Sequence, residues 1–316
     1  MDLSALIGKR LALIFPGQGS QHVGMGKRIH DVSEAARRIF SQADEILRFP
    51  LSQLCFQGPA DELADTLNAQ PAILTVSLAY LEALRERLRE LGQTIQPTFV
   101  AGHSLGEFTA LVAAGVLSFE DALALVRERG RLMKESGQER PGGMAAVIGL
   151  DRAALEQVCR EASALGLVVV ANDNCPGQLV ISGEEAALRR AMELAQERGA
   201  RRVVRLGVTI ASHSPLMERV AHALSELLSR VPLREPEIPI VANITGKILS
   251  TVEEIRHELA QQVVSPVQWT EVVREMTNRG TTAFLEVGPG QVLTGLVRKI
   301  RQDVEAYSVR DFGFEP

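Results

Sequence analysis

Short apolar runs that end at glycine or proline alternate along this chain with longer stretches in which apolar residues recur every three or four positions. The first run, Leu11–Phe15, ends at Pro16-Gly17 and predicts a buried strand. Helical spacing follows over residues 32–47 and 70–91, and Pro71 is expected in the first turn of the second helix. The same region continues with a predicted strand over residues 98–101 and predicted helices over 107–114 and 119–136. This repeated order of strand, turn and helix predicts a parallel sheet covered by helices.

The middle of the chain changes to a β-α-β-β-α-β order, which spans about 65 residues and is typical of a ferredoxin-like unit. Strands are predicted over residues 143–149, 167–171, 178–182 and 201–206, and helices over 152–161 and 184–198. Residues 172–177 are expected to form the loop between the two central strands. We expect residues 139–208 to be a small domain inserted into a discontinuous larger domain of residues 1–138 and 209–316.

The alternation of strands and helices resumes after the predicted insertion. Helices are predicted over residues 215–229, 252–262, 270–279 and 292–300, and strands over 239–242 and 282–286. The end of the chain is expected to be a strand or a tail. The predicted fold class is therefore α/β, with a main parallel sheet and a smaller inserted unit.

The composition excludes several classes of protein. Of the 316 residues, 46% are hydrophobic and 23% are charged, as in an ordinary globular protein. The net charge of −5 disfavours a nucleic-acid partner, because phosphate binding requires a basic surface. The apolar run Leu11–Phe15 is too short for a signal peptide or a membrane span, so no membrane partner is expected. Three scattered cysteines favour reduced thiols and a cytoplasmic location, and the absence of metal-ligand spacing predicts no metal site.

The sequence Gly102-His103-Ser104-Leu105-Gly106 lies between a predicted strand and a predicted helix. A G-x-S-x-G pentapeptide in that context indicates a nucleophile elbow, in which small residues flank a serine on a very tight turn. The N–H groups at the start of the following helix can stabilise negative charge that develops beside the serine. We interpret Ser104 as a nucleophile, and the alternative is a structural turn.

A nucleophilic serine needs a base, and His213 is the strongest candidate among the six histidines. It lies in a loop, Ala211-Ser212-His213-Ser214-Pro215, that precedes a predicted helix. A purely structural role is the alternative for this residue. His103 is adjacent to Ser104 in the turn, and we interpret it as a packing residue. No aspartate between Ser104 and His213 follows a strand end in the expected way, which disfavours an ordinary α/β-hydrolase.

Two further features point to a bound anion. The loop Gly17-Gln18-Gly19-Ser20-Gln21 follows the first strand, and its backbone N–H groups can serve an oxyanion. The loop lacks the Lys-Ser/Thr ending of a P-loop and the G-x-G-x-x-G spacing, which disfavours nucleotide binding. The alternative is a plain turn. Arg129 lies near the apolar face of its predicted helix, three residues after Val126, and an arginine there needs an anionic partner. That partner is either an internal carboxylate or the carboxylate of a substrate.

Short motifs run in a fixed order through residues 11–300. They are Phe15-Pro16-Gly17-Gln18-Gly19-Ser20-Gln21, Gln70-Pro71-Ala72, Gly102-His103-Ser104-Leu105-Gly106-Glu107, Arg129-Gly130, Gly143-Met144-Ala145-Ala146, Asn174-Cys175-Pro176-Gly177-Gln178, Ser212-His213, Ser265-Pro266-Val267-Gln268-Trp269 and Glu286-Val287-Gly288-Pro289-Gly290. In this order they resemble the malonyl-CoA:acyl-carrier-protein transacylase family of fatty-acid synthesis. The resemblance implies an α/β-hydrolase-like core with an inserted ferredoxin-like subdomain.

The resemblance also implies a role for individual residues. Ser104 would be the nucleophile and His213 the base, oriented by the backbone carbonyl of Gln262 instead of by an acid. Gln18 and Leu105 would form the oxyanion hole. Arg129 would clamp the malonyl carboxylate. Asn174 and His103 would line the pocket wall.

The implied substrates are malonyl-CoA and an acidic acyl carrier protein that binds transiently and carries a phosphopantetheine thiol. No permanently bound cofactor is expected, and we expect a monomer. Arg201 with Arg202, and the group Arg298-Lys299-Arg301, are candidate docking residues for the carrier protein. The alternatives are an acyltransferase that serves polyketide carrier proteins, a hydrolase that edits acyl carriers, and a non-catalytic docking module. The stretch of residues 210–213 leaves a methylmalonyl substrate open.

Overall fold

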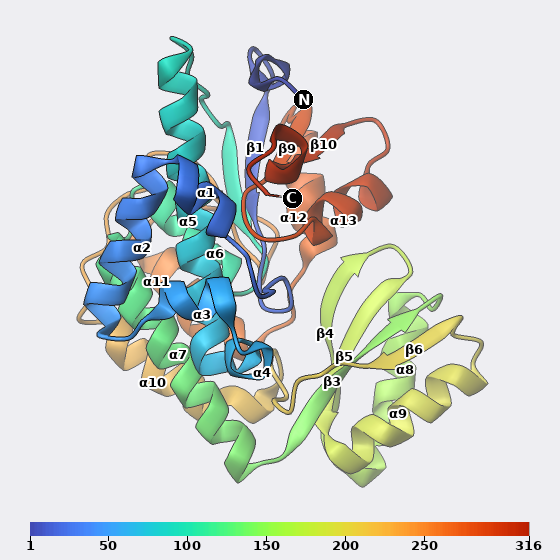
Figure 1. Ribbon diagram of the computed structural model, residues 1–316. Helices are drawn as coiled ribbons and strands as arrows, with labels where there is room; N and C mark the ends of the chain where they lie inside the picture. Colours follow the sequence, from blue (N-terminus) through green and yellow to red (C-terminus); the bar gives the residue numbers. More distant parts are fainter. Residues whose placement is uncertain (316) are drawn as a thin grey trace.

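The computed structural model describes residues 1–315 and contains two separate sheets (Figure 1). The larger sheet has the strand order β10-β9-β1-β2-β7-β8, and all neighbours are parallel except β7 and β8. Its strands are β1 (Leu11–Phe15), β2 (Phe99–Gly102), β7 (Ile240–Val241), β8 (Ile248–Leu249), β9 (Ala283–Glu286) and β10 (Glu305–Ser308). The predicted α/β class with a mainly parallel sheet is confirmed. Within residues 1–315, no helix has the length and apolar character needed to cross a membrane.

Strand β1 lies in the middle of this sheet and is buried on both faces. Leu11, Leu13 and Phe15 pack into one hydrophobic core, whereas Ala12 and Ile14 pack into a second core on the opposite face. This division follows from the two-residue repeat of a strand, and a continuous apolar run is what a strand covered on both faces requires.

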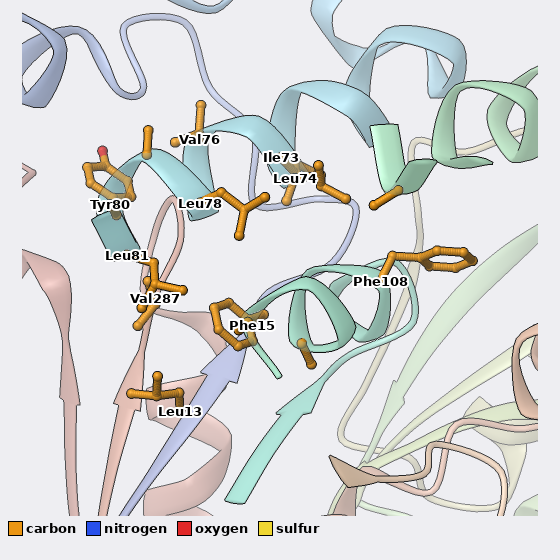
Figure 2. Close-up of a cluster of buried hydrophobic side chains, with 14 of the residues drawn as sticks. Leu13, Phe15, Ile73, Leu74, Val76, Leu78, Tyr80, Leu81, Phe108 and Val287 are labelled. Carbon is orange, nitrogen blue, oxygen red and sulfur yellow. The ribbon is translucent and has the colours of Figure 1, made fainter. Parts of the chain in front are cut away.

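Helices cover both faces of the larger sheet. The first core includes residues of α5 (Thr66–Glu90) and α6 (Gly106–Ala113), and Figure 2 shows side chains of α5 facing Phe15 of β1 and Phe108 of α6. The second core is closed by α12 (Trp269–Asn278) and α13 (Val292–Ile300). The other helices of this part are α1 (Lys27–Val32), α2 (Glu34–Leu47), α3 (Leu51–Gln57), α4 (Ala60–Ala64), α7 (Phe119–Glu139), α10 (Glu218–Leu228) and α11 (Val252–Gln261).

The smaller sheet is antiparallel and has the strand order β4-β5-β3-β6. Two helices cover one of its faces and share a core with it. Its elements are β3 (Gly142–Ile148), α8 (Arg152–Ala162), β4 (Val168–Cys175), β5 (Gln178–Glu184), α9 (Glu185–Glu197) and β6 (Arg202–Arg205). Strand β4 contacts the segment just before α12, because the N–H of Asp173 donates to the carbonyl of Val267 at 2.8 Å and the N–H of Val267 donates to the carbonyl of Ala171 at 2.9 Å.

The long helix α5 begins earlier than predicted. It starts at Thr66, where the side chain of Asp65 caps it by accepting from the N–H of Leu67, so Pro71 lies inside the helix and not in its first turn. A proline at this position leaves the carbonyl of Leu67 without its helical donor. The guanidinium of Arg127 supplies that hydrogen bond instead, at 2.9 Å. The tertiary contact therefore explains how the helix tolerates the proline.

The loop predicted over residues 172–177 is mostly strand. Strand β4 continues to Cys175, which pairs with Gln178 of β5, and only Pro176 and Gly177 remain as the turn. Two register irregularities in β4 accommodate this polar segment, and a strand interrupted by bulges does not show the regular alternation that sequence patterns detect. Asn174 therefore stands on a strand and not on a loop.

Candidate active site

Three polar segments follow the neighbouring parallel strands β1, β2 and β7. The segment after β1 holds Gln18, the segment after β2 holds Ser104, and the segment after β7 holds Asn243. Because the carboxyl ends of parallel strands meet at one edge of the sheet, these segments lie side by side there. That edge is where an α/β sheet commonly binds its ligands.

The turn that carries Ser104 is held in a strained backbone conformation. Ser104 has a φ of +50°, which is rare for a residue other than glycine. A Cβ on Gly102 would lie 1.9 Å from the carbonyl of Gly106, and a Cβ on Gly106 would lie 2.0 Å from the carbonyl oxygen of Phe15. The side chain of Asn243 stabilises the turn by accepting from the N–H of Ser104 and donating to the carbonyl of Gly102, both at 2.7 Å. The two glycines are thus a steric requirement of the serine turn.

The structure brings Ser104 and His213 together although 109 positions separate them, with 2.8 Å between Oγ and Nε2. The Nδ1 atom of His213 lies 2.9 Å from the carbonyl oxygen of Gln262 and 3.1 Å from that of Ser265. Since a carbonyl oxygen only accepts, Nδ1 carries the proton and Nε2 is left free to accept the proton of Ser104. This arrangement needs no aspartate.

His213 is buried and neutral. Its side chain is only 3% exposed, and burial, with a further contribution from the positive charge of Arg129, lowers its pKa to about 3. The imidazole is therefore unprotonated at neutral pH, which is the state a general base requires.

Arg129 projects from α7 into the same site and is 2% exposed. Its Nη1 donates to Oε1 of Gln70 at 2.8 Å, and its Nη2 donates to Oε1 of Gln262 at 3.0 Å and to Oγ of Ser104 at 3.2 Å. Its Nε has no partner, and within residues 1–315 the guanidinium forms no ion pair. The internal carboxylate that the sequence left open as a partner is thus not in contact with it. Burial lowers the pKa of Arg129 to about 10, so the side chain remains a cation at neutral pH.

The predicted oxyanion residues lie against the serine turn. A Cβ on Gly17 would lie 2.4 Å from the carbonyl oxygen of His103, which shows how closely the loop after β1 approaches the turn after β2. The backbone N–H groups of Gln18 and Leu105 donate no hydrogen bond in the part of the chain that the structure describes. Both donors are therefore available to a ligand. The side chain of Gln18 accepts from the hydroxyl of Thr66 at 2.9 Å.

His103 and Asn174, both predicted as pocket residues, contact each other. The Nε2 atom of His103 lies 2.8 Å from Oδ1 of Asn174, and its ring lies 5.6 Å from the ring of Trp269. Burial lowers the pKa of His103, so this histidine is also neutral. Its hydrogen bond connects the serine turn to strand β4 of the smaller sheet, which agrees with a packing role.

Arg201 and Arg202 do not contact the residues around Ser104. Both are exposed at the start of β6, where Arg202 pairs with Ile148 and Ile148 pairs with Gln178. Lys299 of α13 donates to Oε1 of Gln178 at 3.0 Å. Lys299 and the two arginines therefore lie at the same end of the smaller sheet.

Within the second basic group, the three side chains have different surroundings. Arg298 donates to the carbonyl of Ala306 at 2.7 Å, and Arg301 forms an ion pair with Asp303 at 2.6 Å. Among residues 298–301, Lys299 is thus the basic side chain that reaches the smaller sheet.

Sequence reasoning assigned no role to several residues that build the site. Gln70 holds Arg129, Asn243 supports the serine turn, and Ser265 supplies a second carbonyl to His213. Glu107 had a visible signal, because it is a carboxyl group in the otherwise apolar helix α6. The amides Gln70 and Asn243 had no such signal, because the sequence alone does not distinguish a buried amide side chain from an exposed one. Across residues 1–315, no group of three or more His, Cys, Asp or Glu side chains is arranged to hold a metal.

Comparison with known proteins gives one consistent result. The model of the acyl transferase domain family matches residues 12–310. A malonyl CoA-acyl carrier protein transacylase of Bacillus subtilis is 44% identical over 303 residues, which are 96% of this chain and 94% of the relative.

Solved structures agree. An acyl carrier protein S-malonyltransferase from Vibrio cholerae is 38% identical, with a TM-score of 0.89 over 95% of this chain and 96% of that chain. A malonyl-transacylase in complex with a type II polyketide acyl-carrier protein is 40% identical, with a TM-score of 0.90 over 94% and 95% of the two chains. These identities extend over nearly the whole chain, and the resemblance found in the sequence motifs is confirmed: the chain belongs to the malonyl-CoA–acyl carrier protein transacylase family.

Proposed function

We propose that this protein transfers the malonyl group of malonyl-CoA to the phosphopantetheine thiol of an acyl carrier protein, through a malonyl ester on Ser104. One observation carries the proposal: the Ser104 hydroxyl lies between the neutral base His213 and the buried cation Arg129. His213 can activate the hydroxyl as a nucleophile for acyl transfer. Arg129 provides a bidentate donor for an acyl group that itself ends in a carboxylate.

In the first half of the reaction, Arg129 binds the free carboxylate of malonyl-CoA and directs the thioester carbonyl toward Ser104. His213 takes the hydroxyl proton at Nε2 while Oγ attacks the carbonyl carbon. The N–H groups of Gln18 and Leu105 stabilise the negative charge on the carbonyl oxygen. The carbon–sulfur bond then breaks, His213 returns its proton to the departing sulfur, and CoA leaves as a thiol.

The second half uses the same groups in reverse. His213 takes the proton of the phosphopantetheine thiol, and the resulting thiolate attacks the malonyl ester. The ester bond breaks, Ser104 recovers its proton from His213, and the malonyl group leaves on the carrier. No cofactor resident in the enzyme is needed for either half, because the thiol that leaves in the first half and the thiol that attacks in the second both belong to the substrates.

The carrier is expected to dock on the enzyme surface through its negative charge. Arg201, Arg202 and Lys299 at one end of the smaller sheet offer the complementary charge on an enzyme that is acidic overall. Complementary surface charge of this kind acts mainly on encounter and orientation.

The origin of the carrier separates two candidate functions with the same chemistry. The relative in complex with a polyketide carrier favours polyketide supply as the second candidate, beside fatty-acid synthesis. An editing hydrolase is disfavoured by Arg129, because a buried guanidinium gains nothing from an unsubstituted alkyl chain.

Intact-protein mass spectrometry tests the proposal. The protein is mixed briefly with malonyl-CoA, acetyl-CoA or methylmalonyl-CoA, and then with a phosphopantetheinylated carrier protein, with Ser104→Ala as the control. A malonyl adduct that requires Ser104 and moves to the carrier is the expected result. Steady release of CoA without an adduct indicates a hydrolase, and the absence of both indicates a docking module.

A further inference from the structure

Two buried carboxyl groups lie behind the serine turn and take no part in the steps above. Glu107 of α6 is 0% exposed and Glu258 of α11 is 3% exposed. Within residues 1–315, neither carboxyl group forms a salt bridge with a basic side chain. Burying an acid without such a partner is costly, so a fold that keeps two of them here uses their hydrogen-bonding capacity.

Glu107 is bonded directly to the site. One carboxyl oxygen accepts from the backbone N–H of Asn243 at 3.1 Å, and the other accepts from the side-chain amide nitrogen of Gln262. The same nitrogen donates to the carbonyl oxygen of Ser104 at 3.0 Å. Both protons of the Gln262 amide are therefore directed to groups that accept. The amide oxygen is left to face Nη2 of Arg129, at 3.0 Å.

We propose that Glu107 is a positioning residue for the choice of acyl group: it holds the Gln262 amide with its oxygen toward Arg129 and thereby fixes the guanidinium for the substrate carboxylate. This inference deepens the proposed malonyl transfer and rests on it. Gln262 serves the nucleophile through its backbone carbonyl and the acyl group through its side chain. Glu107 supports the binding of the acyl group, because it holds the Gln262 side chain.

Burial disfavours ionisation of both carboxyl groups. Burial raises the pKa of Glu107, and the negative charge of Glu258 raises it further. Burial also raises the pKa of Glu258, which accepts from the N–H of Ile244 at 2.9 Å. Two neighbouring buried acids therefore resist ionising together.

A neutral amide at position 107 cannot replace the carboxyl group. In Glu107→Gln, the new oxygen is needed by the fixed N–H of Asn243, so the new NH₂ group faces the NH₂ group of Gln262. Two donors repel, and the Gln262 amide is expected to turn its oxygen toward position 107. Arg129 then faces a donor in place of an acceptor, and its guanidinium loses the orientation that the malonyl carboxylate needs.

The experiment measures the rates at which Ser104 is acylated by malonyl-CoA and by acetyl-CoA, by rapid quench and intact mass. The acetyl group has no carboxylate, so it does not report on Arg129. We expect Glu107→Gln to lower the malonyl-to-acetyl rate ratio by about tenfold, the usual effect of an unpaired buried donor. Glu258→Gln is the matched control: it makes the same chemical change in the neighbouring acid, whose carboxyl group does not bond to the Gln262 side chain, and the ratio should stay at the wild-type value.

A general loss of structure lowers both rates and leaves the ratio unchanged, so the ratio separates positioning from folding. Glu107→Asp is a second variant for the case that Glu107→Gln does not fold. Its shorter side chain cannot reach both Asn243 and Gln262, and it should lower the ratio as well. A wild-type ratio in either folded variant, or an equal fall in Glu258→Gln, overturns the inference. If the wild-type protein itself forms no malonyl adduct, the proposed function has failed instead.

Discussion

The two hydrogen-bond systems that meet at the Ser104 hydroxyl handle charge in opposite ways. On one side, His213 is neutral and its Nδ1–H is held by two backbone carbonyls, of Gln262 and Ser265. On the other side, Arg129 is a permanent cation whose direct acceptors are neutral side chains. In the proposed function, the first system activates the hydroxyl for any acyl group, whereas the second recognises an acyl group that ends in a carboxylate. In the proposed function, reactivity depends on His213 and selectivity on Arg129, and substitutions at these two residues should separate the two properties.

Removal of the base should have the largest effect and should not discriminate between acyl groups. His213→Ala deprives Ser104 of its proton acceptor, and acylation by malonyl-CoA and by acetyl-CoA should both fall by about 1,000-fold. Rapid-quench mass spectrometry measures both rates, and an unchanged melting temperature serves as the control for folding. A loss confined to malonyl-CoA would mean that His213 acts on the acyl group and not on the hydroxyl.

The pH dependence of acylation by acetyl-CoA reports on the protonation of His213 and not on Arg129. The base form of His213 is lost only as the pH falls through its lowered pKa of about 3. The rate of acylation by acetyl-CoA, which does not involve the substrate carboxylate, should therefore be flat from about pH 8 to about pH 5, below the ordinary histidine pKa of about 6.5. A fall in rate centred near the ordinary value would show that His213 is not held neutral by its surroundings.

The smallest effect is expected far from Ser104. Reversing the charge of Arg201 and Arg202 together to glutamate should raise KM for the carrier protein by about tenfold at low salt, because both lie on the proposed docking surface. KM for malonyl-CoA should not change. Kinetics at several salt concentrations provide the check, and carrier kinetics identical to wild type would remove these residues from the docking surface.

Parts of the fold and of the site could be predicted because local chemistry determines them. The Gly102–Gly106 turn is recognisable because only glycine fits beside the serine, and Leu11–Phe15 is recognisable because both of its faces are buried. Pro71 misled the prediction, since the hydrogen bond that accommodates it comes from Arg127 on another helix. Asn174 misled it because bulges interrupt the alternation of β4.

The contacts that orient the side chains of the site could not be predicted either, because they also join segments that are distant in the sequence. The partners of Arg129 are amides at positions 70 and 262, and nothing in the spacing of the chain indicates that they converge. The alternative of an internal carboxylate could be decided only when the atoms around the guanidinium were known. The residue types and their local motifs indicated which groups could react, whereas the orientation of these groups depends on contacts between distant segments.

The central claim is that Arg129 selects the acyl group while His213 and Ser104 perform the transfer. The most direct test is the single-turnover acylation of Arg129→Gln by malonyl-CoA and by acetyl-CoA, measured side by side with the wild-type protein. Loss of a buried charged pair predicts a fall of about 100-fold with malonyl-CoA. The rate with acetyl-CoA should be retained, so that the malonyl-to-acetyl ratio collapses. An equal loss of both rates, or a preserved ratio, would contradict the account.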